Sequence, residues 1–81
     1  MNLYLIKFTP CGTQFLVNQE TEETAFQSAV KANRIVGEME GTDLSDKSLY
    51  QIEKVDFSVL ANLIQTSVYW GKTDDTIIFD D

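Results

Sequence analysis

The chain contains no histidine and only one cysteine, Cys11. Without histidine the protein lacks the most common general base and metal ligand, which excludes catalytic arrangements built on Ser-His-Asp or Cys-His groups. A single cysteine cannot close an internal disulfide, and without histidine it cannot form the usual structural zinc site. We therefore expect a cytoplasmic protein that is not an enzyme and holds no metal or cofactor.

Glycine residues and apolar runs are too sparse to form two common functional segments. The four glycines, at positions 12, 37, 41 and 71, are too far apart for a phosphate-binding loop or a dinucleotide fingerprint. No apolar stretch approaches the roughly 20 residues that cross a membrane, and the first residues lack the basic and apolar regions of a signal peptide. The sequence thus predicts neither a nucleotide site of these types nor a membrane span.

Acidic residues, by contrast, are in excess and concentrated in two spans. The chain has thirteen Asp and Glu residues and six Lys and Arg residues, which gives a net charge of −7 at pH 7. Eight of the acidic residues lie within residues 38–46 and 73–81: Glu38, Glu40, Asp43, Asp46, Asp74, Asp75, Asp80 and Asp81. A surface of this charge repels nucleic-acid phosphates and anionic lipids. We expect a protein partner with a basic surface, such as a nucleic-acid-binding protein, and no direct contact with nucleic acid or membrane.

The stretch from Glu20 to Gly37 has the clearest secondary-structure signal. Thr21 is the predicted N-cap of a helix, and Gly37 suits the left-handed position after its last turn. The apolar residues recur at the i, i+3, i+4 spacing that places them on one face of a helix. This face consists of Ala25, Phe26, Ala29, Val30, Asn33 and Val36. We expect the remaining elements to fold around this helix.

The rest of the chain predicts four or five strands and a second helix. The strands span Asn2–Phe8, Thr13–Asn18, Ser48–Val55 and Thr76–Phe79, and the second helix spans about Val59–Gln65 with Leu60, Leu63 and Ile64 inward. Residues 65–70 either extend this helix or form a further strand, which their β-branched and aromatic side chains favour. The order β-β-α-β-α-β-β predicts one small α+β domain over residues 1–81, with a mainly antiparallel sheet and both helices on one face.

These properties predict a non-enzymatic acidic binding protein, an inhibitor or adaptor that docks on a basic surface of a protein partner. Regularly spaced carboxylates can occupy a groove that normally holds phosphates, so a nucleic-acid mimic is the most specific form of this hypothesis. Tyr69 and Trp70 are either core residues or apolar anchors of the contact. The predicted partner-binding residues are Glu38, Glu40, Asp43, Asp46, Tyr69, Trp70, Asp74 and Asp75.

In its size, its acidity and its lack of catalytic residues, the chain resembles the small proteins that phages make to inhibit host enzymes or defence systems. This likeness covers no alignable motif and implies no functional residue. Two alternatives stay open from the residues alone. In the first, the chain is a homodimeric assembly module joined through an edge strand such as Thr76–Phe79. In the second, it is a small metal-assisted enzyme that works with carboxylates.

Overall fold

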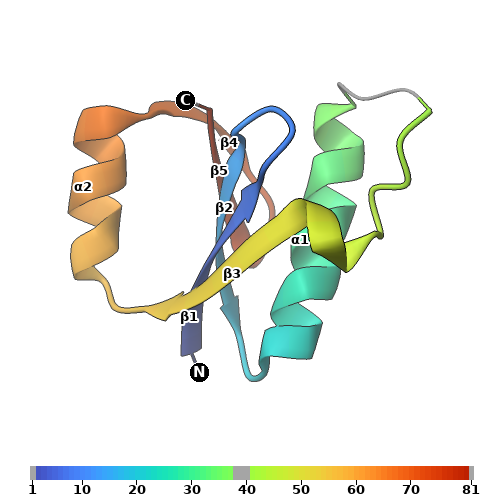
Figure 1. Ribbon diagram of the computed structural model, residues 1–81. Coiled ribbons are helices and arrows are strands. Elements are labelled where there is room, and N and C mark those ends of the chain that lie inside the picture. Colours follow the sequence, from blue (N-terminus) through green and yellow to red (C-terminus); the bar gives the residue numbers. More distant parts are fainter. Residues whose placement is uncertain (1, 38–40, 81) are drawn as a thin grey trace.

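The computed structural model describes residues 2–37 and 41–80 (Figure 1). Along the chain the elements are β1 (Asn2–Phe8), β2 (Gln14–Gln19), α1 (Glu22–Val36), the short 3-10 helix η1 (Lys47–Leu49), β3 (Tyr50–Val55), α2 (Ser58–Thr66), β4 (Val68–Lys72) and β5 (Thr76–Asp80). The α+β fold class and the order β-β-α-β-α-β-β are confirmed. The stretch 65–70 is divided between two elements, because α2 ends at Thr66 and β4 begins at Val68.

The five strands form one antiparallel sheet in the order β3-β1-β2-β5-β4. β3 and β4 are therefore its edge strands, whereas β5 is paired on both sides. The prediction that Thr76–Phe79 is an exposed edge is wrong, because β5 pairs with β2 on one side and with β4 on the other. Ile78 and Phe79 of β5 are almost fully buried, as expected of an interior strand.

The two helices lie on opposite faces of the sheet, as Figure 1 shows. Successive residues of a strand point to opposite faces. Accordingly, Phe15 belongs to the buried cluster under α1, whereas its neighbour Leu16 belongs to the cluster under α2. Ile78 and Phe79 are divided between the clusters in the same way. The prediction that both helices cover one face is wrong.

The strand order explains why the helices separate. β2 and β3 run parallel on either side of β1, and β3 and β4 run parallel because three antiparallel strands lie between them. The connection through α1 leads from β2 to one edge, and the connection through α2 leads from that edge across the sheet to the other. Connections between parallel strands nearly always have the same hand. Two connections that move in opposite directions therefore place their helices on opposite faces.

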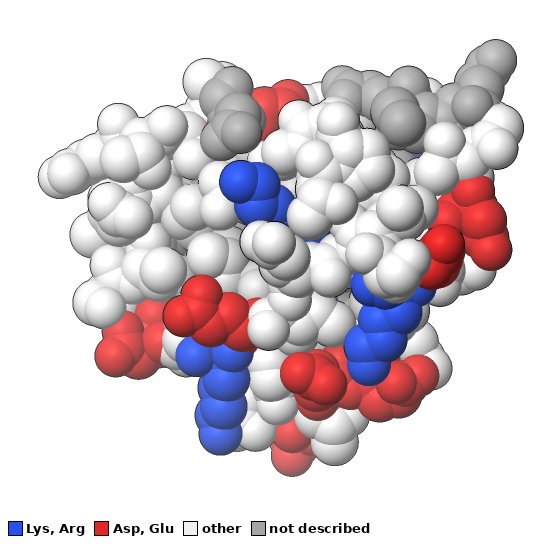
Figure 2. Space-filling model, in the orientation of Figure 1, with Lys and Arg blue, Asp and Glu red and all other residues white. Residues whose placement is uncertain are grey.

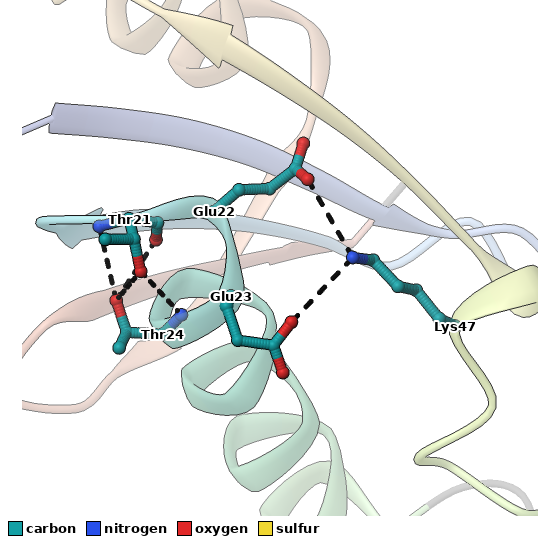
Figure 3. Close-up of polar contacts among 5 residues, drawn as sticks. All are labelled: Thr21, Glu22, Glu23, Thr24 and Lys47. Carbon is teal, nitrogen blue, oxygen red and sulfur yellow. Dashed lines mark hydrogen bonds and ion pairs between the residues drawn. The ribbon is translucent and has the colours of Figure 1, made fainter.

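The N-terminus of α1 is fixed by a capping box and two ion pairs (Figure 3). The Thr21 hydroxyl accepts a hydrogen bond from the Thr24 backbone N–H, and the Thr24 hydroxyl accepts one from the Thr21 N–H, as predicted for an N-cap at Thr21. The ammonium of Lys47 in η1 lies 3.8 Å from a carboxylate oxygen of Glu22 and 4.0 Å from one of Glu23. The segment before β3 is therefore held against the start of α1.

The two faces of the sheet differ in how much they bury. We define the α1 layer as α1 with the sheet face beneath it, and the α2 layer as α2 with the opposite face. The buried cluster of the α1 layer consists of Tyr4, Ile6, Phe8, Phe15, Val17, Ala25, Phe26, Ala29, Val30, Ala32, Tyr50 and Ile78. That of the α2 layer consists of Leu16, Leu63 and Phe79.

Gly37 ends α1 with a φ of 70°, the left-handed conformation predicted for it.

Candidate binding surface

α2 is a short helix that buries little of its surface against the sheet. It begins after Asp56, whose carboxylate accepts hydrogen bonds from the hydroxyl and the backbone N–H of Ser58. These two hydrogen bonds lower the pKa of Asp56 below its ordinary value of 3.8. Of the nine residues of α2, only Leu63 is buried. The helix therefore leaves apolar side chains in contact with water.

A groove of about 380 Å³ lies between α2 and the strands β4 and β5. Its lining is apolar except for Ser67, and consists of Leu60, Ile64, Ser67, Tyr69, Ile77 and Phe79. The ring of Tyr69 stands edge-on to that of Phe79, with 6.2 Å between the ring centres. Tyr69 thus packs against a buried neighbour while the residue itself is 57% exposed. We call this hollow the α2 groove.

The α2 groove continues toward the turn between β4 and β5. A second hollow of about 280 Å³ shares Leu60 and Ile77 with it and is also lined by Phe57, Lys72 and the Asp74-Asp75 turn. The surface between α2 and the sheet is therefore apolar along most of its length and acidic at one end. The structure brings Tyr69 and Asp74 of the predicted set to this side of the molecule, whereas the carboxylate of Asp75 bonds to Gln19 and Ser28 on the α1 side.

Exposed apolar side chains are concentrated on α2, on β4 and on the residue before α2. Among the described residues, six large apolar side chains are exposed, and five of them belong to β4, to α2 or to the residue before it: Phe57, Ile64, Val68, Tyr69 and Trp70. Single exposed apolar residues are normal, but a cluster of them is typical of an interaction surface. Trp70 lies at an irregularity of the β4–β5 pairing between Tyr69 and Gly71 and is 44% exposed. It is therefore not a core residue of the described fold.

Asp74 and Asp75 are neighbours with different environments. Asp74 is exposed, and no side-chain hydrogen bond or ion pair of its carboxylate is found within residues 2–37 and 41–80. Asp75 is partly buried, and its carboxylate accepts hydrogen bonds from side chains of Gln19, Ser28, Thr73 and Thr76. Partial burial alone would raise the pKa of Asp75, but these hydrogen bonds outweigh it and lower the pKa below 3.8. Asp75 therefore has a structural role, whereas Asp74 faces solvent.

The other predicted acidic residues lie elsewhere. Asp43 accepts hydrogen bonds from the hydroxyl and backbone N–H of Ser45, and Asp46 accepts the same pair from Ser48. The hydrogen bonds from Ser45 lower the pKa of Asp43. Both aspartates are exposed on the segment that leads into β3. Glu38 and Glu40 lie outside the described residues.

The predicted partner-binding residues therefore do not form one surface. Asp43 and Asp46 precede β3 at one edge of the sheet, whereas Tyr69, Trp70 and Asp74 lie on or next to β4 at the other. Four strand spacings separate these edges, roughly 19 Å. Figure 2 shows acidic side chains at several separate places, with lysine and arginine side chains between some of them. The structure thus divides the predicted contact into two parts.

Sequence reasoning missed the exposure of Ile64 in α2 and of Val68 in β4. Ile64 was expected to face inward, but it is 65% exposed, and Val68 was not assigned a role. The sequence contained no signal for this exposure, because four large aliphatic side chains in nine residues are ordinary for a helix that packs on a sheet.

Three further observations complete the description. Within residues 2–37 and 41–80, no three cysteine, aspartate or glutamate side chains gather as a metal site requires. None of the helices in those two ranges has both the length and the apolar character needed to span a bilayer. Comparison of the chain with protein-family models, with curated proteins and with solved structures finds no match.

Proposed function

We propose that this protein is a non-enzymatic binding module, an inhibitor or adaptor, that receives an apolar segment of a partner protein in the α2 groove. The observation that carries the proposal is the concentration of exposed apolar side chains on α2 and β4, of which Ile64 and Tyr69 line this groove. Covering apolar surface contributes roughly 25 cal/mol per Å². Partly exposed aromatic residues such as Tyr69 and Trp70 are typical anchors of protein interfaces, because they bury a large area and lose little rotamer freedom.

The negative charge of the chain favours a partner that carries basic residues next to its apolar segment. The chain carries a net charge of −7, so a basic protein approaches it faster than an acidic one. At the end of the α2 groove, the exposed carboxylate of Asp74 offers a contact for an arginine or lysine of the partner. Lys72 lines the same hollow, so the basic residue is expected on the side of Asp74 that faces away from Lys72.

The nucleic-acid mimic and the carboxylate enzyme stay untested hypotheses. A mimic needs carboxylates at regular spacing on one surface, whereas the described carboxylates lie at separate places. The homodimer is favoured by one specific observation, since β4 is an edge strand with three exposed apolar residues. It competes for the same surface as the proposed partner, so the oligomeric state belongs in the test.

A peptide-display selection tests the proposal and requires no identified partner. Random twelve-residue peptides are selected on the immobilised chain and counter-selected on Ile64→Lys, which places a charge in the α2 groove. We expect enriched peptides that carry apolar residues and at least one arginine or lysine. Their affinity should fall at least tenfold for Ile64→Lys, and by a smaller factor for Asp74→Lys. Raising the salt concentration should weaken the Asp74-dependent part.

The matched control changes the acidic residues at the other edge of the sheet. The double variant Asp43→Lys, Asp46→Lys alters the net charge more than Asp74→Lys does, yet we expect it to bind the selected peptides within about threefold of wild type. If this double variant loses binding while Ile64→Lys keeps it, the acidic segment before β3 is the contact and the proposal is wrong. A selection that enriches no peptide for wild type over Ile64→Lys also counts against it.

A further inference from the structure

The backbone of β4 is open on one side. The Thr73 N–H donates to the Thr76 carbonyl, so this pair is a hydrogen-bonded pair of the antiparallel β4–β5 ladder. Hydrogen-bonded and non-hydrogen-bonded pairs alternate along such a ladder, so the next pair, Lys72 with Ile77, is not hydrogen-bonded. The N–H and C=O of Lys72 therefore point away from β5. The following pair, Gly71 with Ile78, is hydrogen-bonded again. Trp70 is an extra residue on β4, so the next pair, Tyr69 with Phe79, is not hydrogen-bonded, and the backbone N–H and C=O of Tyr69 also point away from β5.

The opposite edge of the sheet differs in its side chains. On β3, Gln51, Glu53 and Lys54 are exposed, and charged residues on an edge strand discourage other strands from pairing with it. On β4, Val68, Tyr69 and Trp70 are exposed instead, and Lys72 is the one charged residue. A strand that pairs with β4 would bury apolar side chains, whereas one that pairs with β3 would have to cover charges.

The side chains of β4 are distributed over both faces of the sheet. Tyr69 lies opposite Phe79 and lines the α2 groove, whereas Val68 lies opposite Asp80. Asp80 accepts a hydrogen bond from Thr13 and follows Phe79, so it points to the α1 face. A strand added beside β4 would place alternate side chains next to Tyr69 and Val68. A helix in the groove would reach only the Tyr69 side.

We infer that the partner segment binds in extended conformation, as a sixth strand paired with β4. This inference rests on the proposed function and specifies the form of the bound segment. The segment carries apolar residues at alternate positions, and its end beside the β4–β5 turn carries a lysine or arginine that meets Asp74. Main-chain hydrogen bonds to Tyr69 and Lys72 hold the strand, and the groove selects its side chains.

The variant Lys72→Pro tests strand addition, because proline removes the outward N–H of residue 72. That N–H makes no bond to β5, and proline is tolerated on an edge strand where its position faces solvent. Lys72→Ala is the matched control, since it removes the same charge and keeps the N–H. For the peptides enriched on the wild-type chain, we expect Lys72→Pro to lower the affinity at least tenfold and Lys72→Ala to change it less than threefold.

Amide hydrogen exchange on the wild-type chain gives an answer that does not depend on a variant folding. On adding a selected peptide, we expect exchange of the Lys72 and Tyr69 amides to slow at least tenfold. If peptides bind and need Ile64, but these amides stay unprotected and Lys72→Pro binds as well as Lys72→Ala, the proposed function stands and strand addition is wrong. The same conclusion follows if the enriched apolar residues recur at helical spacing.

A second copy of the chain is the competing occupant of this edge. Light scattering of the free protein at about 50 μM distinguishes the two. We expect a monomer, since two chains of net charge −7 repel each other. A dimer that dissociates in Lys72→Pro but not in Lys72→Ala would show that β4 pairs with its own copy, and would overturn the inference of a basic partner strand.

Discussion

The α1 layer and the α2 layer use one sheet in opposite ways. α1 has 15 residues, six of them buried, and covers a sheet face whose large side chains are almost completely enclosed. α2 has nine residues, one of them buried, and leaves a groove beside β4. In Figure 1 the two helices flank the same five strands. The comparison indicates that the α1 layer supplies most of the stability, whereas the α2 layer keeps apolar surface available for another molecule.

The sharpest test of this division makes the same substitution in both parts of the molecule. Phe15 is fully buried in the α1 layer, whereas Phe57, beside α2, is 73% exposed. Truncation of a buried phenylalanine to alanine costs about 3–5 kcal/mol, because transfer energy is lost and a cavity remains. We expect a loss of that size for Phe15→Ala and less than about 0.5 kcal/mol for Phe57→Ala. Urea unfolding at pH 7 measures both, and equal losses would remove the distinction.

The next largest effect concerns the segment that joins α1 to β3. The hydroxyl of Tyr50 accepts a hydrogen bond from the buried Asn33 amide (3.0 Å) and donates one to the Leu44 carbonyl (2.6 Å). Tyr50→Phe leaves the amide of Asn33 without this partner, which costs about 1–3 kcal/mol. Tyr4→Phe is the control, since no hydrogen bond of the Tyr4 hydroxyl is found in the described part of the chain. A smaller loss for Tyr50→Phe than for Tyr4→Phe would show that the segment is not held by this contact.

The sequence was most informative where the signals are local. The cap at Thr21, the glycine after the last turn and the spacing of the apolar residues predicted α1 to within about two residues at each end. The strands of the first hairpin were predicted for the same reason. Their alternating side chains and the turn residues Pro10 and Gly12 lie within a few positions of each other. The face on which α2 packs depends instead on the order of five strands, which no local pattern contains.

The candidate site was predicted only in part. Tyr69 and Asp74 are among the predicted partner-binding residues and are exposed in the structure, but nothing in the sequence distinguishes Asp74 from Asp75. The difference arises because Gln19 and Ser28, which are 56 and 47 positions away from Asp75, donate hydrogen bonds to it in the folded chain. Likewise, whether Ile64 faces the sheet or the solvent depends on how α2 is oriented on the sheet, which no local pattern contains.

A pH-dependent effect of intermediate size concerns the β4–β5 turn, which Asp75 joins to α1. Its carboxylate accepts hydrogen bonds from Gln19 of β2 and from Ser28 of α1, both on the α1 side of the sheet. Because its folded pKa is below 3.8, the ionised carboxylate stabilises the protein fully above about pH 4, and this contribution is lost as the pH falls through the folded pKa. Asp75→Asn should therefore cost about 1–2 kcal/mol at pH 7.

The same variant should flatten the loss of stability below about pH 4, because its side chain takes up no proton there. Urea unfolding at several pH values checks both parts of this prediction. Asp74→Asn is the control, with a change below about 0.5 kcal/mol at pH 7, since the exposed carboxylate of Asp74 is surrounded by water. If the two variants behave alike, the hydrogen bonds to Asp75 do not stabilise the attachment of the β4–β5 turn to α1.

The smallest effect on stability belongs to the residue that matters most for the proposed function. Ile64 lines the α2 groove and is 65% exposed, so Ile64→Lys removes little buried area, and the lysine ammonium can reach water. We expect its free energy of unfolding in urea to stay within about 0.5 kcal/mol of wild type, while peptide binding is lost. Leu63→Lys, one position earlier and buried, should cost several times more because it places a charge under α2. If Ile64→Lys were as destabilising as Leu63→Lys, the groove would be part of the core, and the α2 layer would not differ from the α1 layer in the way described.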